Sequence, residues 1–423
     1  MASPIGKKIA IIGSGISGLL SAYLLSRRNQ VVVYEAADVI GGHTATKTVH
    51  IGDTKFEIDT GFIVFNDRTY PNFIKLLEMI GVAYQPTDMG FSVSCAATGF
   101  EYAGTSLNGV FAQRKNIFNP GHWRMLAEIL RFNKACTQLY RSDEIPQGKT
   151  LGDYLREQGY SERFSRLYIL PMVSAIWSSG LETAAAMPLV FFVRFFHNHG
   201  LLTVTGQPQW YTIKGGSHQY LAPLTQHFRE SIHTSCPVSS VMRSADGVLV
   251  NSNKFGEQRF DEVIFACHSD QALKILADPS PAEYEILSAI PYKPNDVVLH
   301  SDLRFLPAST RAWASWNYLL QEGAEDATAL TYNMNILQRL NAPVTFCVSV
   351  NAGENIDQDK VYGRYNYSHP MFTLDSIAAQ ARWAEISGVN RTHYCGAYWR
   401  NGFHEDGVVS AIRVAQALGE IWE

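Results

Sequence analysis

The stretch IAIIGSGISGLLSAYLL, residues 9–25, decides the fold of this 423-residue chain. Its first four residues are apolar and predict a buried parallel strand, and its last seven predict a helix directly after that strand. Three glycines separate the two elements. Gly13 allows a tight turn, Gly15 lets the backbone approach a pyrophosphate, and Gly18 lets the helix lie close to the strand. The stretch therefore predicts a dinucleotide-binding βα unit.

A second strand is predicted from VVVYEA, residues 31–36, and it ends at an acidic side chain. The carboxylate of Glu35 can accept hydrogen bonds from the ribose hydroxyls of an adenosine. The diphosphate is expected on the N-terminus of the preceding helix, where free N–H groups and the helix dipole favour negative charge. We therefore expect the dinucleotide to contact Gly13, Ser14, Gly15, Ile16, Ser17, Gly18, Glu35 and Ala36.

A second pair of glycines, Gly41 and Gly42 in VIGGHT, begins six residues after Glu35 and indicates FAD rather than NAD. An NAD site needs only the first glycine loop, whereas a second glycine turn often wraps a flavin dinucleotide. The regions between the FAD motifs contain no further GxGxxG. A separate NAD(P)H-binding domain is therefore not expected.

Two further motifs, DTGFIVFNDRTYP (residues 59–71) and THYCGAYWRNGFHEDG (residues 392–407), complete a resemblance. The chain resembles the flavin-containing amine oxidoreductase family, which has the glutathione-reductase-type FAD fold and includes carotenoid desaturases and protoporphyrinogen oxidase. The resemblance implies FAD held without a covalent bond, because no cysteine matches the flavin-linking position. It also implies cofactor contacts in four places: Gly41, Gly42, His43 and Thr44 at the second glycine turn; Gly61, Phe62 and Ile63 beside the isoalloxazine ring; Val241 and Ala266 near the adenosine half; and Gly396, Gly407 and Val408 near the C-terminus.

Two details of the resemblance bear on the flavin. The family usually has an arginine after the second glycine pair, and His43 stands there in this chain. A helix opening at Gly407 is expected to direct its free N–H groups at the N1 and O2 edge of the flavin, where such donors stabilise the anionic reduced form.

The expected fold class is α/β, with a Rossmann-like FAD-binding domain of the glutathione-reductase type and an inserted α+β substrate domain. The FAD-binding domain is predicted from three segments, residues 1–90, 211–290 and 386–423. The substrate domain is predicted from residues 91–210, which have helical patterns, and residues 291–385, which read as strands of an antiparallel sheet covering the flavin.

Composition limits the other classes of function. Hydrophobic residues make up 46% of the chain and charged residues 17%, which is typical of a globular protein, and the net charge of −4 gives no reason to expect a nucleic acid partner. The six cysteines are widely spaced without a CxxC, so neither a metal site nor a disulfide framework is predicted. No apolar run reaches the ~18 residues of a membrane span. We predict a cytoplasmic protein, for which peripheral contact with a membrane stays open.

The substrate is indicated less directly. The segments LPMVSAIWS, FFHNHGLL, QWYTIKGGS and GFHEDG resemble a bacterial subgroup of NAD/FAD-binding oxidoreductases associated with modification of fatty acyl chains. Residues 91–210 contain eleven Lys and Arg against eight Asp and Glu, a net charge of +3, while the rest of the chain carries −7. A basic rim suits an acyl chain with an anionic head or a phospholipid surface; the alternative is solvated helix faces.

Aromatic and aliphatic residues in the same region admit two interpretations. They could line a lipid tunnel, or they could be plain core, which is the commoner role of aromatics at helical spacing. The set comprises Phe164, Leu167, Tyr168, Leu170, Trp177, Phe192, Phe195 and Phe196.

His404 in GFHEDG is the predicted catalytic acid or base, because it precedes Gly407 by three residues and has an ordinary pKa near ~6.5. A capping or core hydrogen bond is the alternative role for this side chain.

Amine oxidases of the family have an aromatic cage where this chain has Phe403 and His404. They also have a lysine near the flavin, and Lys293 is displaced from the matching position. Both departures favour an FAD-dependent oxidoreductase that removes hydride from carbon in a small lipophilic substrate, a fatty acyl desaturase. The alternatives are a flavin amine oxidase, a fatty acid double-bond isomerase, and a lipid-binding protein that keeps FAD for structure.

Overall fold

The computed structural model describes residues 6–177, 179–203, 206–321 and 329–422. Its N-terminal stretch forms the centre of a five-stranded parallel sheet in the order β10-β2-β1-β14-β20. These strands are β1 (Lys8–Ile12), β2 (Gln30–Tyr34), β10 (Ile232–His233), β14 (Glu262–Phe265) and β20 (Thr392–Tyr394). They come from all three segments predicted for FAD binding, so strands far apart in the sequence build one sheet.

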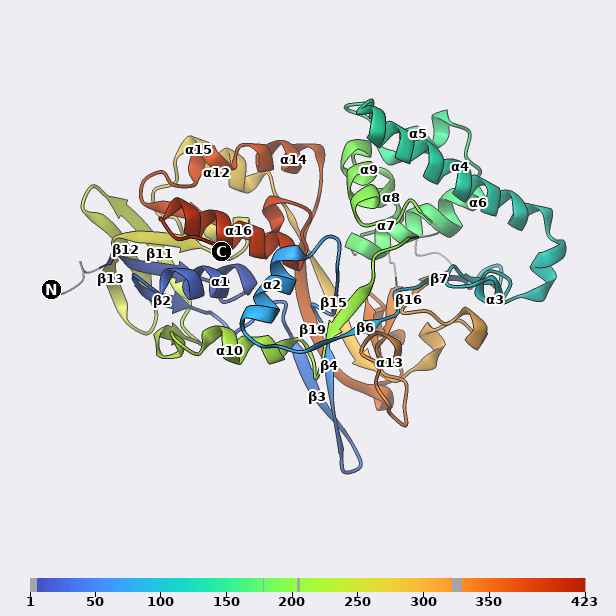
Figure 1. Ribbon diagram of the computed structural model, residues 1–423, viewed down its shortest axis with the longest axis horizontal. Coiled ribbons are helices and arrows are strands. Elements are labelled where there is room, and N and C mark those ends of the chain that lie inside the picture. The colour runs from blue at the N-terminus through green and yellow to red at the C-terminus, as the bar shows by residue number, and fades with distance from the viewer. Residues whose placement is uncertain (1–5, 178, 204–205, 322–328, 423) are drawn as a thin grey trace.

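Both faces of this sheet are covered, which explains why β1 and β14 are apolar at successive positions rather than at alternate ones. On one face α1 (Ile16–Leu25) packs against α16 (His404–Ala417). On the other face lies a three-stranded antiparallel sheet of β11 (Val238–Ser244), β12 (Gly247–Ser252) and β13 (Gly256–Phe260), which contacts β1 and β14. The result is the α/β architecture predicted from the sequence (Figure 1).

A seven-stranded sheet forms the second body of the molecule, in the order β19-β15-β18-β17-β16-β7-β8. Its neighbouring strands are antiparallel except for the parallel pair of β16 and β7. The strands are β7 (Phe91–Cys95), β8 (Phe100–Ala103), β15 (Tyr292–His300), β16 (Trp316–Leu320), β17 (Ala329–Asn333), β18 (Cys347–Val350) and β19 (Val361–Pro370).

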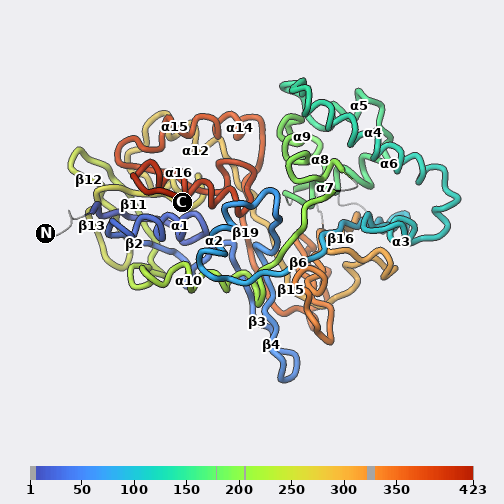
Figure 2. Tube along the Cα trace, in the orientation of Figure 1, coloured from blue at the N-terminus to red at the C-terminus, as the bar shows by residue number. Residues whose placement is uncertain are grey.

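Helices of the first insert pack against one end of this sheet and form an apolar core of their own (Figure 2). They are α3 (Leu107–Val110), α4 (Pro120–Ser142), α5 (Leu151–Glu157), α6 (Glu162–Phe164), a π-helical turn at Ser165–Ile169, α7 (Leu170–Trp177), α8 (Leu181–Ala185) and α9 (Leu189–Asn198). None of the helices within the described residues is both long enough and apolar enough to cross a membrane.

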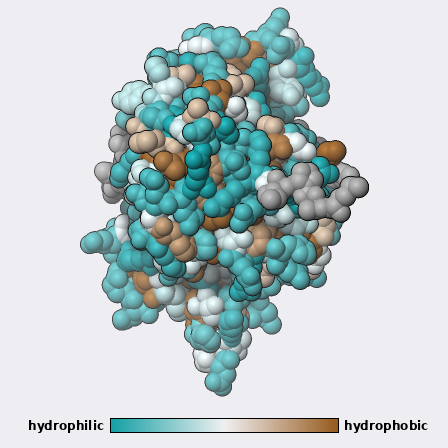
Figure 3. Space-filling model, turned by 90° about the vertical axis from the view of Figure 1, so that its left-hand side faces the viewer, coloured by the Kyte–Doolittle hydropathy of each residue, from teal (hydrophilic) through white to brown (hydrophobic). Residues whose placement is uncertain are grey.

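The remaining elements lie between the two bodies or pack on one of them. A hairpin of β3 (Thr46–Ile51) and β4 (Thr54–Asp59) projects from the molecule, and β5 (Val64–Asn66), β9 (Trp210–Ile213) and β6 (Tyr84–Thr87) form a small sheet. The other helices are α2 (Pro71–Met79), α10 (Leu221–Thr225), α11 (Ser269–Ile275), α12 (Pro281–Ser288), α13 (Met334–Leu337), α14 (Leu374–Ala381) and α15 (Trp383–Ile386). Seen from the end that carries the five-stranded sheet, the surface is mostly hydrophilic, with apolar residues scattered over it (Figure 3).

A buried ion pair fixes three elements of the nucleotide-binding body to one another. The Arg243 guanidinium on β11 donates two hydrogen bonds to the Glu283 carboxylate on α12, at 2.5 and 2.9 Å, and the Tyr394 hydroxyl on β20 donates a third at 2.7 Å. The side chains of Arg243 and Glu283 are only 4% and 3% exposed. Burial raises the pKa of the Glu283 carboxyl, but these hydrogen bonds outweigh burial and hold the pKa below its ordinary value.

We expect Glu283→Ala to lower the free energy of unfolding by about 1.5–3 kcal/mol, the range for hydrogen bonds to a charged group, because the buried Arg243 then keeps only the Asp278 carboxylate, at 3.1 Å, as a charged partner. Since the folded pKa is depressed, this stabilisation is present above the unfolded pKa of ~4.3 and is lost as the pH falls through the folded value. Chemical unfolding at pH 7 and at lower pH measures both effects. The control is Glu285→Ala on the same helix, which removes an exposed pair with Arg382 and should cost less than about 1 kcal/mol. Equal decreases in the free energy of unfolding of the two variants would contradict a special role of the buried pair.

Candidate active site

The carboxyl ends of β1, β2 and β14 meet at the first glycine loop. The Gly13 N–H donates to the Tyr34 carbonyl at 2.8 Å, and the Ala266 N–H donates to the Ile12 carbonyl at 2.8 Å. A Cβ on Gly13 would lie 2.7 Å from the Ala266 carbonyl oxygen, and one on Gly18 would lie 2.0 Å from the Gly13 carbonyl oxygen. The structure thus gives both glycines the close backbone contacts predicted for them and brings Ala266 to the same point.

Gly15 differs from Gly13 and Gly18, because no atom of the described residues, apart from its own chain neighbours, lies within 4 Å of where its Cβ would be. It directly precedes the first turn of α1, whose N–H groups have no partner inside the helix. Ile16 and Ser17 belong to this first turn. The open space and the free donors together form a cradle for a negatively charged group such as a diphosphate.

Glu35 lies beside this cradle at the end of β2. Its carboxylate accepts hydrogen bonds from the Ser14 N–H at 2.9 Å, the Ser14 hydroxyl at 2.5 Å and the Ala37 N–H at 2.8 Å. Ala36, which was also predicted to contact the cofactor, is exposed between them. Glu35 therefore orders the glycine loop and presents acceptor oxygens where a ribose would follow the diphosphate.

The second glycine turn touches the first. The Gly41 N–H donates to the Ser14 carbonyl at 3.0 Å, and a Cβ on Gly42 would lie 3.2 Å from the Gly15 Cα. Thr44, at the end of the turn, is buried and bonded to the Tyr220 hydroxyl at 2.5 Å. The residues 41–44 predicted at the cofactor do lie beside the first loop.

His43 occupies the wall between the second glycine turn and the segment after β4. Its carbonyl accepts the Phe62 N–H at 2.7 Å and lies 2.2 Å from where a Cβ of Gly61 would be. Burial, reinforced by the neighbouring His369 and His268, lowers the pKa of His43 to about 3, so the imidazole is neutral. Its Nε2 is buried without a hydrogen-bond partner among the described residues. The cleft thus has an unpaired polar atom and open space, which fit a bound FAD.

The C-terminal contact differs from the expectation. The last helix, α16, begins at His404 rather than at Gly407, and the Gly407 N–H already donates to the Phe403 carbonyl at 3.2 Å. Gly407 instead allows close packing of two helices, because a Cβ there would lie 2.8 Å from Ile16 Cγ2 and 2.9 Å from the Ser17 hydroxyl. Val408 is fully buried in the same contact region. The free N–H groups of α16 therefore belong to residues before Gly407.

The prediction that Val241 lies near the adenosine half of FAD stays a prediction. Val241 is buried in the middle of β11, and its carbonyl accepts the Ala277 N–H at 2.9 Å. This bridge uses the backbone that was expected to hold the adenine. Cys236, whose N–H donates to the Glu35 carbonyl at 2.8 Å, lies much nearer to the ribose site. Gly396 does lie at the end of β20, where its N–H donates to the Ser410 hydroxyl at 3.0 Å.

His404 is enclosed by aromatic side chains. Its ring stacks on Phe62 at 3.7 Å between centroids, meets Phe73 edge-on at 4.9 Å, and is hydrogen-bonded through Nε2 to the Tyr220 hydroxyl at 2.8 Å. Burial lowers the pKa of His404 to about 3, with a smaller contribution from His43. Phe62, predicted beside the flavin, therefore contacts the predicted catalytic histidine directly. Ile63, which follows it, is buried in a separate apolar cluster.

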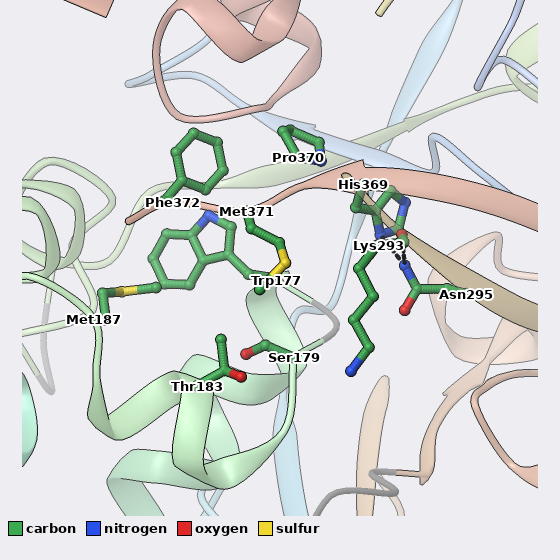
Figure 4. Close-up of a pocket in the computed structure, with 10 residues that line it drawn as sticks. All are labelled: Trp177, Ser179, Thr183, Met187, Lys293, Asn295, His369, Pro370, Met371 and Phe372. Atoms are coloured by element: carbon green, nitrogen blue, oxygen red, sulfur yellow. Dashed lines mark hydrogen bonds between the residues drawn. The ribbon is translucent and has the colours of Figure 1, made fainter. Parts of the chain in front are cut away.

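A pocket lies between the helices of the first insert and the strands of the second (Figure 4). It contains about 390 Å³ of space, part of it open to solvent. Its residues are Trp177, Ser179, Thr183, Met187, Lys293, Asn295, His369, Pro370, Met371 and Phe372. Apolar side chains gather on one side of it and polar ones on the other.

The polar side of the pocket comes from paired strands. Lys293 on β15 lies directly opposite His369 on β19, and the Asn295 side-chain amide donates to His369 Nδ1 at 3.2 Å. Burial, with a contribution from His268, lowers the pKa of His369 to about 4. The sequence placed Lys293 away from the flavin, but the structure puts it on the pocket wall. Asn295 and His369 were not predicted at all, because only the strand register brings them together.

The pocket borders the segment before α16. Trp177 donates its indole N–H to the Asn401 carbonyl at 3.3 Å, and a Cβ on Gly402 would lie 3.1 Å from the Phe372 ring. Phe403 packs on Phe195 at 5.1 Å. Among the aromatic residues considered for a lipid tunnel, Phe164, Phe192, Phe195 and Phe196 are buried in core contacts, and only Trp177 lines this pocket.

Comparison with known proteins agrees with this geometry. The model of a family described as flavin containing amine oxidoreductase matches residues 16–308. Among solved structures, cyclohexylamine oxidase from Brevibacterium oxydans IH-35A has 16% identity, a TM-score of 0.70, and 98% of each chain covered. A putative protoporphyrinogen oxidase from Exiguobacterium sp. 255-15 has 17% identity and a TM-score of 0.68, covering 98% of this chain and 99% of that chain. A CLA-producing fatty acid isomerase from P. acnes has 13% identity and a TM-score of 0.69, covering 97% of this chain and 98% of that chain. No curated protein sequence matches.

The cradle around Gly15 gives a test of cofactor binding. We expect Gly15→Ala to fold normally, because its Cβ meets no protein atom, but to bind FAD more weakly, because the methyl group fills the space of the diphosphate. We expect Glu35→Ala to weaken FAD binding by roughly 1.5–3 kcal/mol, the range for a hydrogen bond to a charged group. Titration of the FAD-free protein measures both. Gly18→Ala is the contrast, since its Cβ would clash with the Gly13 carbonyl and should destabilise the fold itself. Wild-type affinity in both Gly15→Ala and Glu35→Ala would exclude this cleft as the FAD site.

Proposed function

The chain belongs to the flavin-containing amine oxidoreductase family and is an FAD-dependent oxidoreductase, and we propose that it removes hydride from carbon in a fatty acyl substrate. Loss of a hydride from one carbon and of a proton from its neighbour leaves a carbon–carbon double bond. The proposed reaction is therefore a desaturation.

The charge of the pocket carries this proposal. The described residues that line it include one lysine and no carboxylate. A protonated amine entering the pocket would meet the Lys293 ammonium without an opposite charge to offset the loss of its hydration. An acyl carbonyl or carboxylate would instead find a cation and hydrogen-bond donors. The charge distribution thus favours an acyl compound over an alkylamine.

The apolar side of the pocket suits the rest of such a substrate. Trp177, Met187 and Phe372 form a surface without formal charge next to the polar strands. Methylene groups gain free energy by leaving water for such a surface, about 0.8 kcal/mol for each one buried. Bound FAD supplies the hydride acceptor. The chain itself orients the substrate between Lys293 and the aromatic wall and excludes water from the reacting carbons.

His369 is fixed as a hydrogen-bond donor. The Asn295 side-chain oxygen accepts the Asn351 amide at 2.8 Å, which leaves the Asn295 nitrogen to donate to His369 Nδ1. Because the imidazole is neutral and its Nδ1 accepts, its proton is on Nε2. His369 can therefore donate a hydrogen bond but cannot accept the proton in this arrangement. The proton acceptor must be another side chain.

A flavin amine oxidase is the second candidate, and one observation favours it. Lys293 lies on the pocket wall, and a lysine near the flavin is a feature that the family resemblance associates with amine oxidases. A double-bond isomerase differs from the desaturase in two ways: the hydride returns to the carbon chain at another position, and there is no net loss of a proton. A lipid-binding protein that keeps FAD for structure is the remaining alternative.

We expect long-chain acyl lipids to reduce the bound flavin under anaerobic conditions, and common monoamines and polyamines not to do so. Stopped-flow absorbance at the flavin band measures reduction, and mass spectrometry of the lipid identifies the product. Net bleaching with a new double bond supports desaturation. A shifted double bond without bleaching indicates an isomerase, and binding without either change indicates a binding protein. Rapid bleaching by an amine, with no response to any lipid, would reject the acyl proposal.

Two single substitutions separate the proton acceptor from the residue that binds the acyl head group. If His404 accepts the proton, as proposed from the sequence, His404→Ala should slow flavin reduction by about 10²–10⁴ without loss of FAD. Burial lowers the pKa of His404 to about 3, so its imidazole is neutral, and its Nε2 is bonded to the Tyr220 hydroxyl. Lys293 is charged in the proposed binding mode and has no lone pair to accept a proton, so its substitution tests substrate binding. Lys293→Met should raise KM for an acyl substrate with little change in the reduction rate at saturation, and a nearly wild-type rate in His404→Ala would exclude His404 as the proton acceptor.

A further inference from the structure

A cluster of exposed apolar side chains lies at the end of the molecule farthest from the five-stranded sheet. Leu107, Phe118 and Trp123 are 80%, 87% and 51% exposed, and Ile117 and Leu130 are also exposed. We call this set the α3–α4 surface, because its members lie on α3, on the following 3-10 helix (Arg114–Phe118) and on α4. Surface apolar residues are normal when they are scattered singly, but a contiguous group marks a binding surface.

Contacts between the three elements show that the group is contiguous. The Phe111 and Trp123 rings are 5.2 Å apart, and the Trp123 indole N–H donates to the Ile117 carbonyl at 2.8 Å. Arg114 donates to the Asn108 side chain on α3 and to the Phe111 carbonyl. On α4, Trp123 and Leu130 are seven residues apart and so lie on the same face of the helix. The exposed side chains are thus held on one folded surface.

Cations surround these apolar side chains. Arg114, Lys115, Arg124, Arg131 and Lys134 are all exposed. Residues 107–134 contain only one acidic residue, Glu128. Its carboxylate is buried, where it is bonded to Arg124 at 3.2 Å and to the Ser161 hydroxyl. Residues 107–134 therefore present apolar and positively charged groups, and the exposed Glu162 on the neighbouring α6 is 3.6 Å from the Arg166 guanidinium.

The position of the surface sets it apart from the rest of the molecule. The chain between α3 and α4 forms the end opposite the nucleotide-binding sheet (Figures 1 and 2). The face of the molecule that the nucleotide-binding sheet forms at the other end is mostly hydrophilic.

We propose that the α3–α4 surface docks on a bilayer that contains anionic phospholipid. Apolar side chains interleaved with Lys and Arg are the composition of elements that lie in the membrane interface. Leu107, Phe118 and Trp123 enter the boundary between headgroups and acyl chains, while the surrounding cations pair with lipid phosphates. The charge complementarity selects an anionic bilayer over a protein partner, whose interface core is normally depleted of charge. The inference does not depend on the substrate of the pocket.

Flotation of the FAD-loaded full-length protein with vesicles tests this proposal. We expect it to bind vesicles of phosphatidylcholine with phosphatidylglycerol and to bind pure phosphatidylcholine at least tenfold more weakly. Binding should weaken as salt is raised, because the attraction between exposed charges is screened. Absence of binding to the anionic vesicles would overturn the proposal.

Matched variants locate the contact. We expect the double variant Leu107→Ser and Phe118→Ser to lower the vesicle affinity at least tenfold with unchanged FAD content and melting temperature, because both side chains are almost fully exposed. Lys115→Gln with Lys134→Gln should lower it only for anionic vesicles. The control is Leu374→Ser with Ile421→Ser, which removes two exposed apolar side chains elsewhere. Equal binding by the first double variant and the control would overturn the assignment.

Measurement of the oligomeric state tests the main alternative, an interface between two copies of the chain. If the α3–α4 surface were an interface between two copies of the chain, the wild type would be a dimer in size-exclusion chromatography with light scattering. The Leu107→Ser and Phe118→Ser variant would then be a monomer, and neither would float with vesicles. That combined result would reject membrane docking.

Discussion

The structure depends on close contact between the backbones of β1, α1 and the end of β14, where glycines leave no side chain between them. A Cβ on Gly18 would lie 2.0 Å from the Gly13 carbonyl, and one on Gly13 would lie 2.7 Å from the Ala266 carbonyl. These contacts fix how closely α1 lies on β1 and where β14 ends. The free N–H groups of α1, the Glu35 carboxylate and the second glycine turn can meet only because this approach is so close. The cofactor cleft is therefore a direct consequence of two positions that have no side chain, Gly13 and Gly18.

The start of α16 lies between the cofactor cleft and the substrate helices. Two carboxylates fix its first turn: Asp406 accepts the Asn401 and Phe403 N–H groups at 3.2 and 2.9 Å, and Glu405 accepts N–H groups at the start of α2. Burial raises the pKa of Asp406 to about 6, against these hydrogen bonds. Just before these two carboxylates in the chain, Phe403 packs against Phe195 of the substrate helices and His404 is bonded to Tyr220 on the cofactor side. Two neighbouring residues thus face the two halves of the molecule.

The sequence predicted the parts of the fold whose causes are local. Gly13, Gly15, Gly18 and Glu35 have fixed spacing within one βα unit, and the structure brings all four to one loop. The surroundings of Gly407 and Val241 could not be predicted in the same way, because the start of α16 and the bridge from Val241 to Ala277 depend on capping and on long-range pairing. The aromatic residues of the first insert show the same limit. Their spacing identifies a buried helix face but cannot separate Phe192, in the core, from Trp177, on the pocket wall.

Strand register, rather than composition, decides the chemistry of the pocket. Side chains alternate along a strand, so Lys293 and Asn295 share one face of β15 while Asp296 has the opposite face, 3.7 Å from Arg364. Cross-strand pairing then sets Lys293 opposite His369. A shift of one residue would exchange the lysine for the carboxylate and invert the charge that a substrate meets. The similar folds found among amine oxidases and a fatty acid isomerase fit this view, since a shared scaffold can turn different charges toward its pocket. The choice between an acyl group and an amine therefore rests on which side chains the register of β15 and β19 presents, and in this chain it presents a cation and neutral donors.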